Sequence, residues 1–451
     1  MLGGMVGSRG FALGRGTVGA LCKKSCFNVG SRALSGTVYA WGEGTSGQLG
    51  LGAVKMNRSS FGGDEKHVGQ TPRRLPSSKN LDFCKLAMGD TFTLGVTNAG
   101  FLYGWGKFWG LGNQGEVDVL EPTALSLEPE FKSVSAGKFH GAAIDKAGQV
   151  YTFGQYANKG DKGGFFSFLS TAPEGGWLGH GDDDDCDTPR MIESFKEYGA
   201  AARDVVCGDM HTLILTDDGE VLSCGVGESG RLGTGDTEIS STPTSIEALI
   251  HETVVGIAAG ANCSYALTEA GKLYAWGMNQ RGQLGIADSF LDPNSVEVFP
   301  TEVDQSELHG GTISKVTACG SRAAILTTSG QVYVWGRGLM HTPHRLVLDN
   351  YYENMGQKAD GSDDPVVDLV FGGDSRWYSL AMVLRSGRMI TVGDAGSSLL
   401  ARPGVMGKQE AGLVEAYAPK PKGALPMVMQ VFGGRGQHMA CLVDSSQRVE
   451  I

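Results

Sequence analysis

The sequence predicts an all-β protein, a seven-bladed β-propeller closed by strands from both termini. A segment close to V-x-A-G-x-x-H-x-x-A-L-T-x-x-G-x-V-Y-x-W-G recurs seven times, most clearly in 315–336, 256–277 and 205–225. Successive copies are 48 to 71 residues apart, too irregular for a solenoid of near-identical units. A repeated unit of this length cannot bury its apolar face alone, so the copies must pack against one another. Seven small antiparallel sheets fit one ring.

Each copy predicts three or four short strands. In the copy at 315–336, Thr328-Ser329-Gly330 supplies a tight turn between antiparallel strands. A β-branched and aromatic strand, 332–335, follows the turn. Small residue pairs precede the second strand of four copies, which indicates a strand pressed against a neighbour or a crowded axis. These pairs are Ala136-Gly137, Cys207-Gly208, Ala259-Gly260 and Cys319-Gly320.

The two ends of the chain predict how the ring closes. The last copy stops at 447–451, which is only the start of a tryptophan strand. The complete strand, 37–42, stands at the other end of the chain. We therefore expect the last blade to be built from both termini, which removes an open sheet edge.

These residues resemble the regulator of chromosome condensation family, whose members are seven-bladed propellers. The resemblance covers about 36–451, and its most specific motif is a G-x-x-x-x-G-Q-L-G tail after the tryptophan strand. The tail stands at 42–50 and 277–285, and at 225–233 with Arg in place of Gln. Blades six and seven depart from it, because Gly336 is followed by RGLMHTP and Gly393 by DAGSSLLARPG.

The first 34 residues predict a mitochondrial transit peptide. Residues 1–42 contain no Asp or Glu, but they include Arg9, Arg15, Lys23, Lys24 and Arg32. An acid-poor leader with Arg and Ser is typical of import into mitochondria. Cleavage near Leu34 leaves 33 basic and 49 acidic residues and a net charge of −16. A flexible basic N-terminus is the alternative, and a secretory signal fits less well because Gly and Arg interrupt the apolar stretch. We expect a matrix protein with no transmembrane segment and no global basic surface for nucleic acid.

Several motifs that suggest cofactors or metals have plainer explanations. G-x-G-x-x-G at 42–47 and 225–230 follows strands but precedes Gly-rich stretches, not a phosphate-binding helix. The acidic run 182–187 has Asp187 where a calcium loop requires Gly, so a solvated acidic connection is favoured, with Lys159, Lys162 or Arg190 offsetting its charge. Cys207, Cys263 and Cys319 are expected to be buried small residues. We predict no cofactor, no metal site and no catalytic residue.

His140, His211 and His438 occupy the same place in three repeats. One interpretation is structural, a histidine that bonds a backbone group of the next strand. The other assigns His211 and His438 to partner binding. No Ser, Cys or carboxylate is placed beside these histidines as a nucleophile with a base would be, which argues against an enzyme.

Insertions between the strands are predicted at 53–71, 155–177, 288–311, 349–365 and 397–426. Aromatic and charged residues gather in 155–177, which suggests either an interface anchor or a cover for a neighbouring blade. The residues expected to bind a partner there are Lys159, Asp161, Lys162, Phe165, Phe166 and Phe168. In 397–426, either a phosphate-contacting arm for RNA or a plain basic linker explains Arg402, Lys408, Lys420 and Lys422.

The resemblance implies three functions. Family members that exchange nucleotide on a Ran-type GTPase carry an insertion where 155–177 stands, and they place acidic and His residues of the repeat loops against the GTPase. His211 and His438 match that pattern, whereas Lys138 stands where an acid is expected. Mitochondrial members imply ribosome assembly or RNA metabolism, and one line implies respiratory-complex biogenesis. We expect a non-catalytic scaffold for protein and rRNA partners; the alternatives are an exchange factor for a mitochondrial GTPase and a subunit or assembly factor of a respiratory complex.

Overall fold

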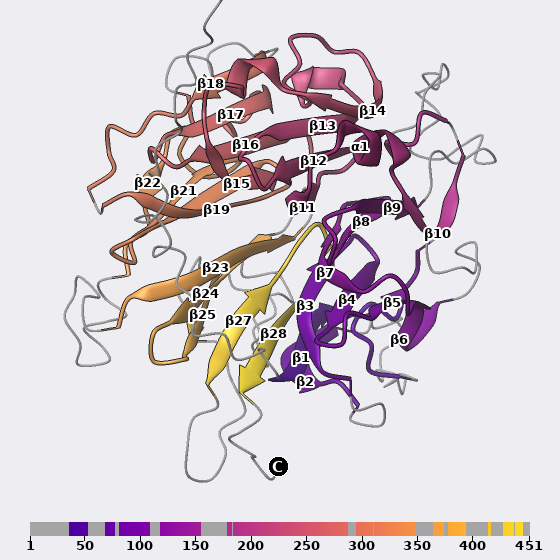
Figure 1. Cartoon of the computed structure of the whole chain (residues 1–451). Helices are drawn as coiled ribbons and strands as arrows, with labels where there is room; N and C mark the ends of the chain where they lie inside the picture. Colours follow the sequence, from indigo (N-terminus) through magenta and orange to yellow (C-terminus); the bar gives the residue numbers. More distant parts are fainter. Residues whose placement is uncertain are drawn as a thin grey trace, which may run out of the picture. The chain divides into compact units, whose positions relative to one another are not determined.

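The computed structural model describes residues 36–52, 68–76, 81–108, 118–154, 178–182, 184–286, 295–309, 311–348, 364–373, 378–393, 414–415, 427–436 and 438–444. Residues 34–451 form one compact unit. Its strands make seven four-stranded antiparallel sheets, the blades of a β-propeller (Figure 1). The predicted all-β, seven-bladed fold is confirmed.

Each of the first four blades runs in sequence order from its inner to its outer strand. Blade 1 comprises β3 (Phe83–Met88), β4 (Phe92–Thr97), β5 (Leu102–Gly106) and β6 (Val119–Ser126). Blade 2 comprises β7 (Phe131–Ala136), β8 (His140–Asp145), β9 (Val150–Gly154) and β10 (Cys186–Met191), followed by the short helix α1 (Glu193–Tyr198). Blade 3 comprises β11 (Ala202–Cys207), β12 (His211–Thr216), β13 (Val221–Gly225) and β14 (Ser240–Ser245), with the 3-10 turns η3 (Glu228–Gly230) and η4 (Glu247–Leu249). Blade 4 comprises β15 (Val254–Ala259), β16 (Cys263–Thr268), β17 (Leu273–Met278) and β18 (Val296–Glu302).

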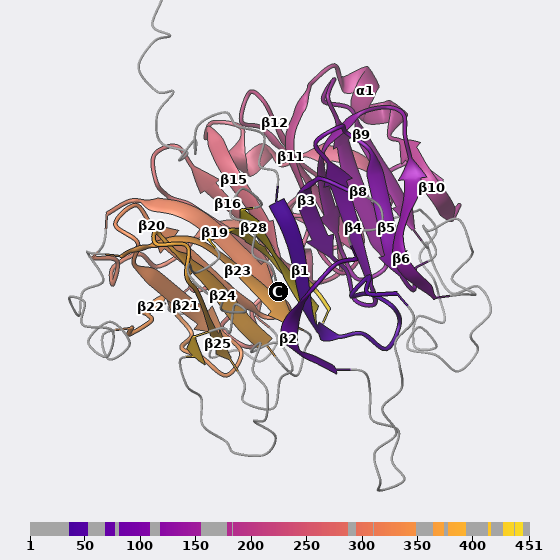
Figure 2. The same cartoon turned by 90° about the horizontal axis from the view of Figure 1, so that it is seen from below.

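The last three blades complete the ring (Figure 2). Blade 5 comprises β19 (Ile313–Cys319), β20 (Arg322–Thr327), β21 (Val332–Gly336) and β22 (His344–Arg345). Blade 6 comprises β23 (Val366–Gly373), β24 (Tyr378–Leu384), β25 (Met389–Gly393) and β26 (Val414–Glu415). Blade 7 comprises β27 (Val428–Phe432), β28 (His438–Asp444), β1 (Gly36–Glu43) and β2 (Val68–Arg74).

Blade 7 closes the ring as the sequence predicts. Strand β1 pairs antiparallel with β28 over seven residue pairs, from Gly36–Asp444 to Gly42–His438. N-terminal and C-terminal strands therefore share one sheet, and neither end of the repeat array presents a free edge.

The inner strands meet at a crowded axis. A Cβ atom on Gly137 would lie 2.2 Å from the carbonyl oxygen of Gly208, and one on Gly208 would lie 2.8 Å from that of Gly260. A Cβ atom on Gly260 would in turn lie 2.7 Å from the carbonyl oxygen of Gly320. The second residue of these small pairs is therefore glycine because neighbouring blades approach one another backbone to backbone. This confirms the expectation of a crowded axis.

Prolines protect the outer edges of the sheets. A proline lies within the outermost strand of five blades, where a missing N–H removes a donor that another sheet edge could pair with. These residues are Pro72 in β2, Pro122 in β6, Pro189 in β10, Pro243 in β14 and Pro300 in β18.

The hydrophobic core lies between adjacent blades. Phe108, which follows β5, stacks on Phe92 of blade 1 at 3.8 Å between ring centroids and meets Phe153 of blade 2 at 6.0 Å. Fully buried Trp276 of blade 4 packs in one cluster with Leu213 and Leu215 of blade 3. Each blade therefore buries its apolar side chains only when its neighbour is present, as expected for a repeat of this kind.

Candidate functional site

One face of the ring collects the longer connections. In blade 2, Ala136 at the end of the first strand pairs with Gly141, His140 pairs with Gly154, and Gly154 pairs with Cys186. The connections between strands one and two and between strands three and four therefore start from the same end of the blade. We call this end of the blades the loop face. The opposite end carries tight turns such as Asp145–Gly148 and is called the turn face.

The connections after the third strands belong to the loop face. Each of five third strands has a glycine at its last or next-to-last residue, and this glycine pairs with one of the first two residues of the second strand. These glycines are Gly106, Gly154, Gly277, Gly393 and Gly42. The chain outside the described residues that follows them spans 109–117, 155–177, 287–294, 394–413 and 53–67. By contrast, 349–363 lies between β22 and β23 and is attached at the turn face.

The predicted binding residues in the insertions lie outside the described residues. Lys159, Asp161, Lys162, Phe165, Phe166 and Phe168 fall in 155–177, whose attachment points are Gly154 and Leu178 on the loop face. Arg402 and Lys408 fall between β25 and β26, whereas Lys420 and Lys422 fall between β26 and β27. Strand β26 therefore divides the stretch 397–426, which the sequence suggested to be one arm. Two other predicted insertions also contain strands: β18 lies in 288–311, and β2 begins within 53–71.

The repeated histidines join neighbouring blades. His211 Nε2 lies 2.9 Å from Ser264 Oγ of blade 4, and Ser264 Oγ donates to the carbonyl of Arg231 at 2.8 Å. His438 Nε2 lies 2.9 Å from Thr93 Oγ1 of blade 1, which donates to the carbonyl of Gln48 at 2.8 Å. His140 Nε2 contacts Thr212 Oγ1 of blade 3 at the same distance of 2.9 Å. Each imidazole thus bonds the hydroxyl of the next blade.

These contacts define the tautomer of the histidines. The hydroxyls of Ser264 and Thr93 use their single proton on a carbonyl, so they accept from Nε2–H of His211 and His438. The Nδ1 atoms of all three histidines are buried without a hydrogen-bond partner. Burial therefore lowers the pKa of His140 and His438 to about 4, and it lowers the pKa of His211 well below its usual value. The histidines are neutral at physiological pH.

Burial also corrects one predicted role. His211 is 0% exposed and His438 is 1% exposed, and both form blade-to-blade bonds. Neither side chain reaches the surface, so direct contact with a partner is excluded for both. The structural interpretation therefore describes these histidines better than partner binding does. The predicted bond was to a backbone group, but each imidazole contacts a hydroxyl of the next blade. Only for His438 does a backbone group also take part, the Phe92 carbonyl at 3.1 Å.

Tryptophans reinforce the same joints. The indole Nε1–H of Trp105, Trp276 and Trp335 donates to the carbonyl of Gln48, Arg231 and Gln283 at 2.9, 3.0 and 2.8 Å. The acceptor is in each case the Gln or Arg of the G-x-x-x-x-G-[QR]-L-G tail of the preceding blade. The tail motif thus presents one carbonyl to the tryptophan of the next blade. The carbonyls of Gln48 and Arg231 also accept from a hydroxyl of the next blade, whereas that of Gln283 accepts from Tyr265 of its own blade.

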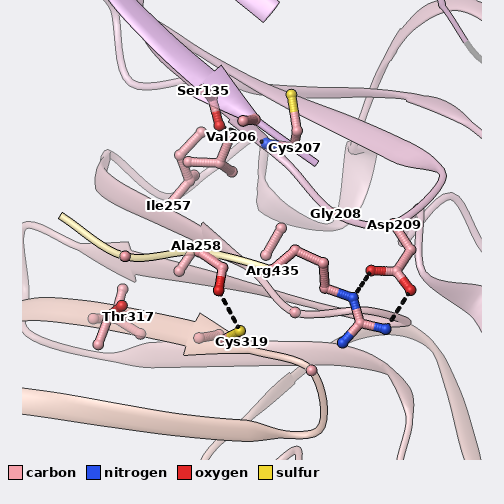
Figure 3. A pocket seen from close by; sticks show the side chains of 18 residues that line it. Ser135, Val206, Cys207, Gly208, Asp209, Ile257, Ala258, Thr317, Cys319 and Arg435 are labelled. Atoms are coloured by element: carbon pink, nitrogen blue, oxygen red, sulfur yellow. Dashed lines mark hydrogen bonds and ion pairs between the residues drawn. The ribbon is translucent and has the colours of Figure 1, made fainter. Parts of the chain in front are cut away.

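A cavity of about 190 Å³ lies on the ring axis, lined by the inner strands of blades 2 to 5 and by residues 433–435 (Figure 3). Arg435 follows β27 of blade 7 and faces Asp209 of blade 3. Arg435 Nε lies 2.5 Å from Asp209 Oδ1, and Nη2 donates to Oδ2 at 2.8 Å. Both side chains are nearly buried, at 13% and 11% exposure. The Cys319 thiol, on β19, lies at the same cavity.

Sequence reasoning missed this ion pair. Asp209 and Arg435 are 226 residues apart and stand in loops that vary between repeats. Their common place after the axial glycines, Gly208 and Gly434, was the available signal. The sequence positions of Asp209 and Arg435 do not show that the two side chains meet across the axis of the ring.

The remaining motifs are structural. Arg190 Nη2 lies 2.8 Å from Asp182 Oδ2, so Arg190 offsets part of the acidic run, whereas Lys159 and Lys162 lie outside the described residues. Cys207, Cys263 and Cys319 are buried as predicted, and burial raises the pKa of Cys207 to about 12 and of Cys263 to about 11. Among the described residues, no cluster of three His, Cys, Asp or Glu is arranged to hold a metal ion. No helix in that part of the chain is long and apolar enough to cross a membrane.

Comparison with known proteins identifies the repeat. The family described as Regulator of chromosome condensation (RCC1) repeat matches residues 35–96, 174–215, 218–267 and 270–325. Human E3 ubiquitin-protein ligase HERC2 is 33% identical over 316 residues, which are 68% of this chain and 6% of the ligase. RCC1 domain-containing protein RUG3, mitochondrial, from Arabidopsis thaliana is 31% identical over 290 residues, 61% of this chain and 57% of RUG3. The chain thus spans less than two thirds of these two relatives.

Two further similarities extend over more of the chain. The human RCC1-like G exchanging factor-like protein is 28% identical over 354 residues, 71% of this chain and 69% of the relative. The crystal structure of human WBSCR16 matches with a TM-score of 0.71 and 22% identity, covering 91% of this chain and 99% of that one. At this identity the structural likeness shows the fold alone. Together with the repeats and the seven blades, these matches show that the chain belongs to the family of proteins built from regulator of chromosome condensation (RCC1) repeats.

Proposed function

We propose that this protein is a non-catalytic propeller scaffold of the mitochondrial matrix, which binds protein and rRNA partners in ribosome assembly or RNA metabolism. The observation that carries this proposal is the common attachment of five connections to the loop face. A rigid ring that presents several loops on one side offers a composite binding surface, since binding residues concentrate on loops held by a scaffold. The basic leader 1–34 and the mitochondrial relative RUG3 support the compartment.

The repeated polar residues also support a scaffold, because they are engaged within the ring. The imidazoles of His140, His211 and His438 are neutral, buried and bonded to hydroxyls of the next blade. The hydroxyls of Ser264 and Thr93 in turn donate to carbonyls, so we infer that these groups stabilise the ring and do not supply a base to a substrate. Recognition is then left to the loops, in keeping with function carried by sites grafted on a common fold.

The test is affinity purification of the tagged full-length protein from isolated mitochondria, with and without RNase. The proposal expects ribosomal proteins and rRNA to co-purify, and RNase or rising salt to weaken the association where phosphate contacts contribute. Recovery of a respiratory membrane complex that survives nuclease, with no ribosomal component, would contradict it.

Deletion of 159–168 tests the loop face directly. The matched control is deletion of 351–360, also ten residues, from a connection attached at the turn face. We expect the first deletion to reduce partner recovery and the second to leave it unchanged. Equal recovery after both deletions would overturn the assignment of binding to the loop face.

A second function, nucleotide exchange on a mitochondrial GTPase, is favoured by the place of 155–177 on the loop face of blade 2 and by the relative called an exchanging factor-like protein. The engagement of Asp209 by Arg435 weighs against it, because an acidic loop residue is held within the chain. Exchange activity would appear as faster release of labelled GDP from the GTPase in the presence of this protein, and would be lost on deletion of 159–168. An unchanged release rate would eliminate this function.

A further inference from the structure

Residues 433–436 connect β27 to β28 and pass across the ring axis at the loop face. Figure 1 shows the yellow chain beyond β27 reaching from its own blade toward β11 of blade 3. The Arg435 N–H donates to the carbonyl of Met88 in blade 1 at 3.2 Å, and Gly373 N–H of blade 6 donates to the carbonyl of Gly434 at 3.0 Å. The segment is therefore held by blades other than its own.

A thiol on blade 5 holds the same segment. Cys319 Sγ lies 3.1 Å from the carbonyl oxygen of Gly434 and 3.1 Å from that of Gly373, so its single proton is shared between them. Cys319 is 8% exposed and lies at the axial cavity behind residues 433–435. The carbonyl of Gly434 contacts the thiol directly, so displacement of this segment uncovers it.

Glycine permits the crossing. A Cβ atom on Gly434 would lie 2.1 Å from the Met88 carbonyl oxygen, and one on Gly433 would lie 2.4 Å from that of Phe371. A Cβ atom on Gly436 would lie 2.3 Å from the Gly89 carbonyl oxygen. Backbone atoms lie on several sides of the segment, so it fits the axis only without side chains at these three positions.

Arg435 is the one charged residue of the segment, and it pairs with Asp209 of blade 3 through two nitrogen–oxygen contacts of 2.5 and 2.8 Å. Of the two contacts, the one from Nη2 to Oδ2 is a hydrogen bond between charged groups, which is stronger than one between neutral groups. Asp209 lies in the loop after Gly208, and its N–H donates to the carbonyl of Ala261 in blade 4 at 3.3 Å. The ion pair thus ties blade 7 to a loop that is itself held by the next blade.

We propose that residues 433–436 form a latched strap that closes the axial cavity at the loop face, with Arg435–Asp209 as the latch. The strap opens locally when the latch is broken, because the hydrogen bonds that join blades through His211, His438 and the tryptophans are made by other residues. The strap contributes one hydrogen bond, from Gly373 to Gly434, to the joint between blades 6 and 7. Opening exposes the Cys319 thiol and the cavity of about 190 Å³ to solvent from the loop face. The ring itself stays folded.

The experiment measures alkylation of individual cysteines in the full-length protein by mass spectrometry, under native conditions. In Arg435→Met, we expect the alkylation rate of Cys319 to rise by on the order of tenfold or more, because a broken buried ion pair shifts the local opening equilibrium. Cys224 on β13 is 0% exposed and distant in the blade from the axis, so it reports global unfolding and is expected not to change. Asp209→Asn should reproduce the effect.

Two further variants separate the latch from general destabilisation. Gly434→Ala keeps both charges and displaces the strap by collision with Met88, so it should also expose Cys319. Arg388→Met breaks another nearly buried ion pair, Arg388–Asp364 at 2.8 Å with 13% and 5% exposure, at the turn face of blade 6. This control should leave Cys319 protected. Unchanged Cys319 alkylation in Arg435→Met, or a rise matched by Cys224, would overturn the proposal.

Discussion

The joints between blades 3 and 4 and between blades 6 and 7 hold the ring by different means. The first joint combines His211, Ser264, the Arg231 carbonyl and Trp276 in one polar clamp. Blade 6 has no Q-L-G tail after β25, and its described contacts with blade 7 are chiefly apolar, with Ala381, Val383 and Met439 in one cluster. The strap adds the hydrogen bond from Gly373 to Gly434.

This difference is one between the described residues of the two joints, since 394–413 after β25 lie outside them. A complete tail offers a fixed carbonyl to the next blade, so the joint is directional and repeats from blade to blade. In the described part of the joint between blades 6 and 7, apolar packing makes most of the contact and the strap adds one hydrogen bond. The two kinds of joint should respond differently to mutation and pH.

The largest effect is expected at a complete clamp. Trp276→Ala removes a fully buried indole and its hydrogen bond to Arg231, and should lower the free energy of unfolding by about 3–5 kcal/mol. Chemical denaturation monitored by far-UV circular dichroism measures this change. A loss below about 1 kcal/mol would show that the clamp does not hold the joint.

The next effect concerns pH. Because burial lowers the pKa of His140 and His438 to about 4, the unfolded chain binds more protons than the folded chain between pH 6.5 and 4. Stability should therefore fall as pH decreases through this window, by up to about 3 kcal/mol for each histidine. Denaturation at a series of pH values measures the slope. Replacement of His140 and His438 by Gln should flatten it, and an equal slope in that variant would contradict the assignment.

A smaller effect tests why glycine precedes the histidine. In Gly208→Ala the new methyl group would lie 2.1 Å from Cε1 and 2.4 Å from Nδ1 of His211, so overpacking should reduce stability by about 1–3 kcal/mol. The loss should be smaller when His211 is also replaced by Ser. Strict additivity of the two substitutions in a double-mutant cycle would mean that the methyl group and the imidazole do not interact.

The smallest effect compares the clamps that have Gln in the tail with the one that has Arg231. The side-chain Oε1 atoms of Gln48 and Gln283 each accept from the backbone N–H of the residue two positions earlier, at 2.8 Å. Arg231, at the same place in blade 3, is 1% exposed, and its Nη1 atom has no hydrogen-bond partner. Burial also lowers the pKa of Arg231. Arg231→Gln should therefore raise stability by about 1 kcal/mol. Lower stability in thermal unfolding would show that Arg231 has a role that the tail motif does not explain.

Much of this architecture could be predicted from the sequence because each repeat contains local signals for its own strands. The turn glycines and tryptophan strands gave the blade number, and the incomplete last copy gave the closure between β1 and β28. The crowded axis followed from pairs such as Cys207-Gly208. These signals are local and recur in seven copies, so a weak copy can be interpreted by comparison with the clear ones.

The strap and the loop assignments could not be predicted in the same way. Arg435 and Asp209 meet because of the ring diameter and the blade order, neither of which is encoded near either residue. Strand β26 is two residues long, so no periodicity marked it within 397–426. The histidines carried a visible pattern, but only their burial shows that the pattern serves the joints and not a partner.

Chemical cross-linking of the protein to its partners in intact mitochondria tests the central claim most directly, because lysines mark both faces. Lys107 and Lys138 follow loop-face glycines, while exposed Lys146 and Lys272 lie in turns of the turn face. The account predicts partner cross-links at Lys107 and Lys138 and in 155–177, and few at Lys146 and Lys272. Cross-links concentrated on Lys146 and Lys272 would contradict it.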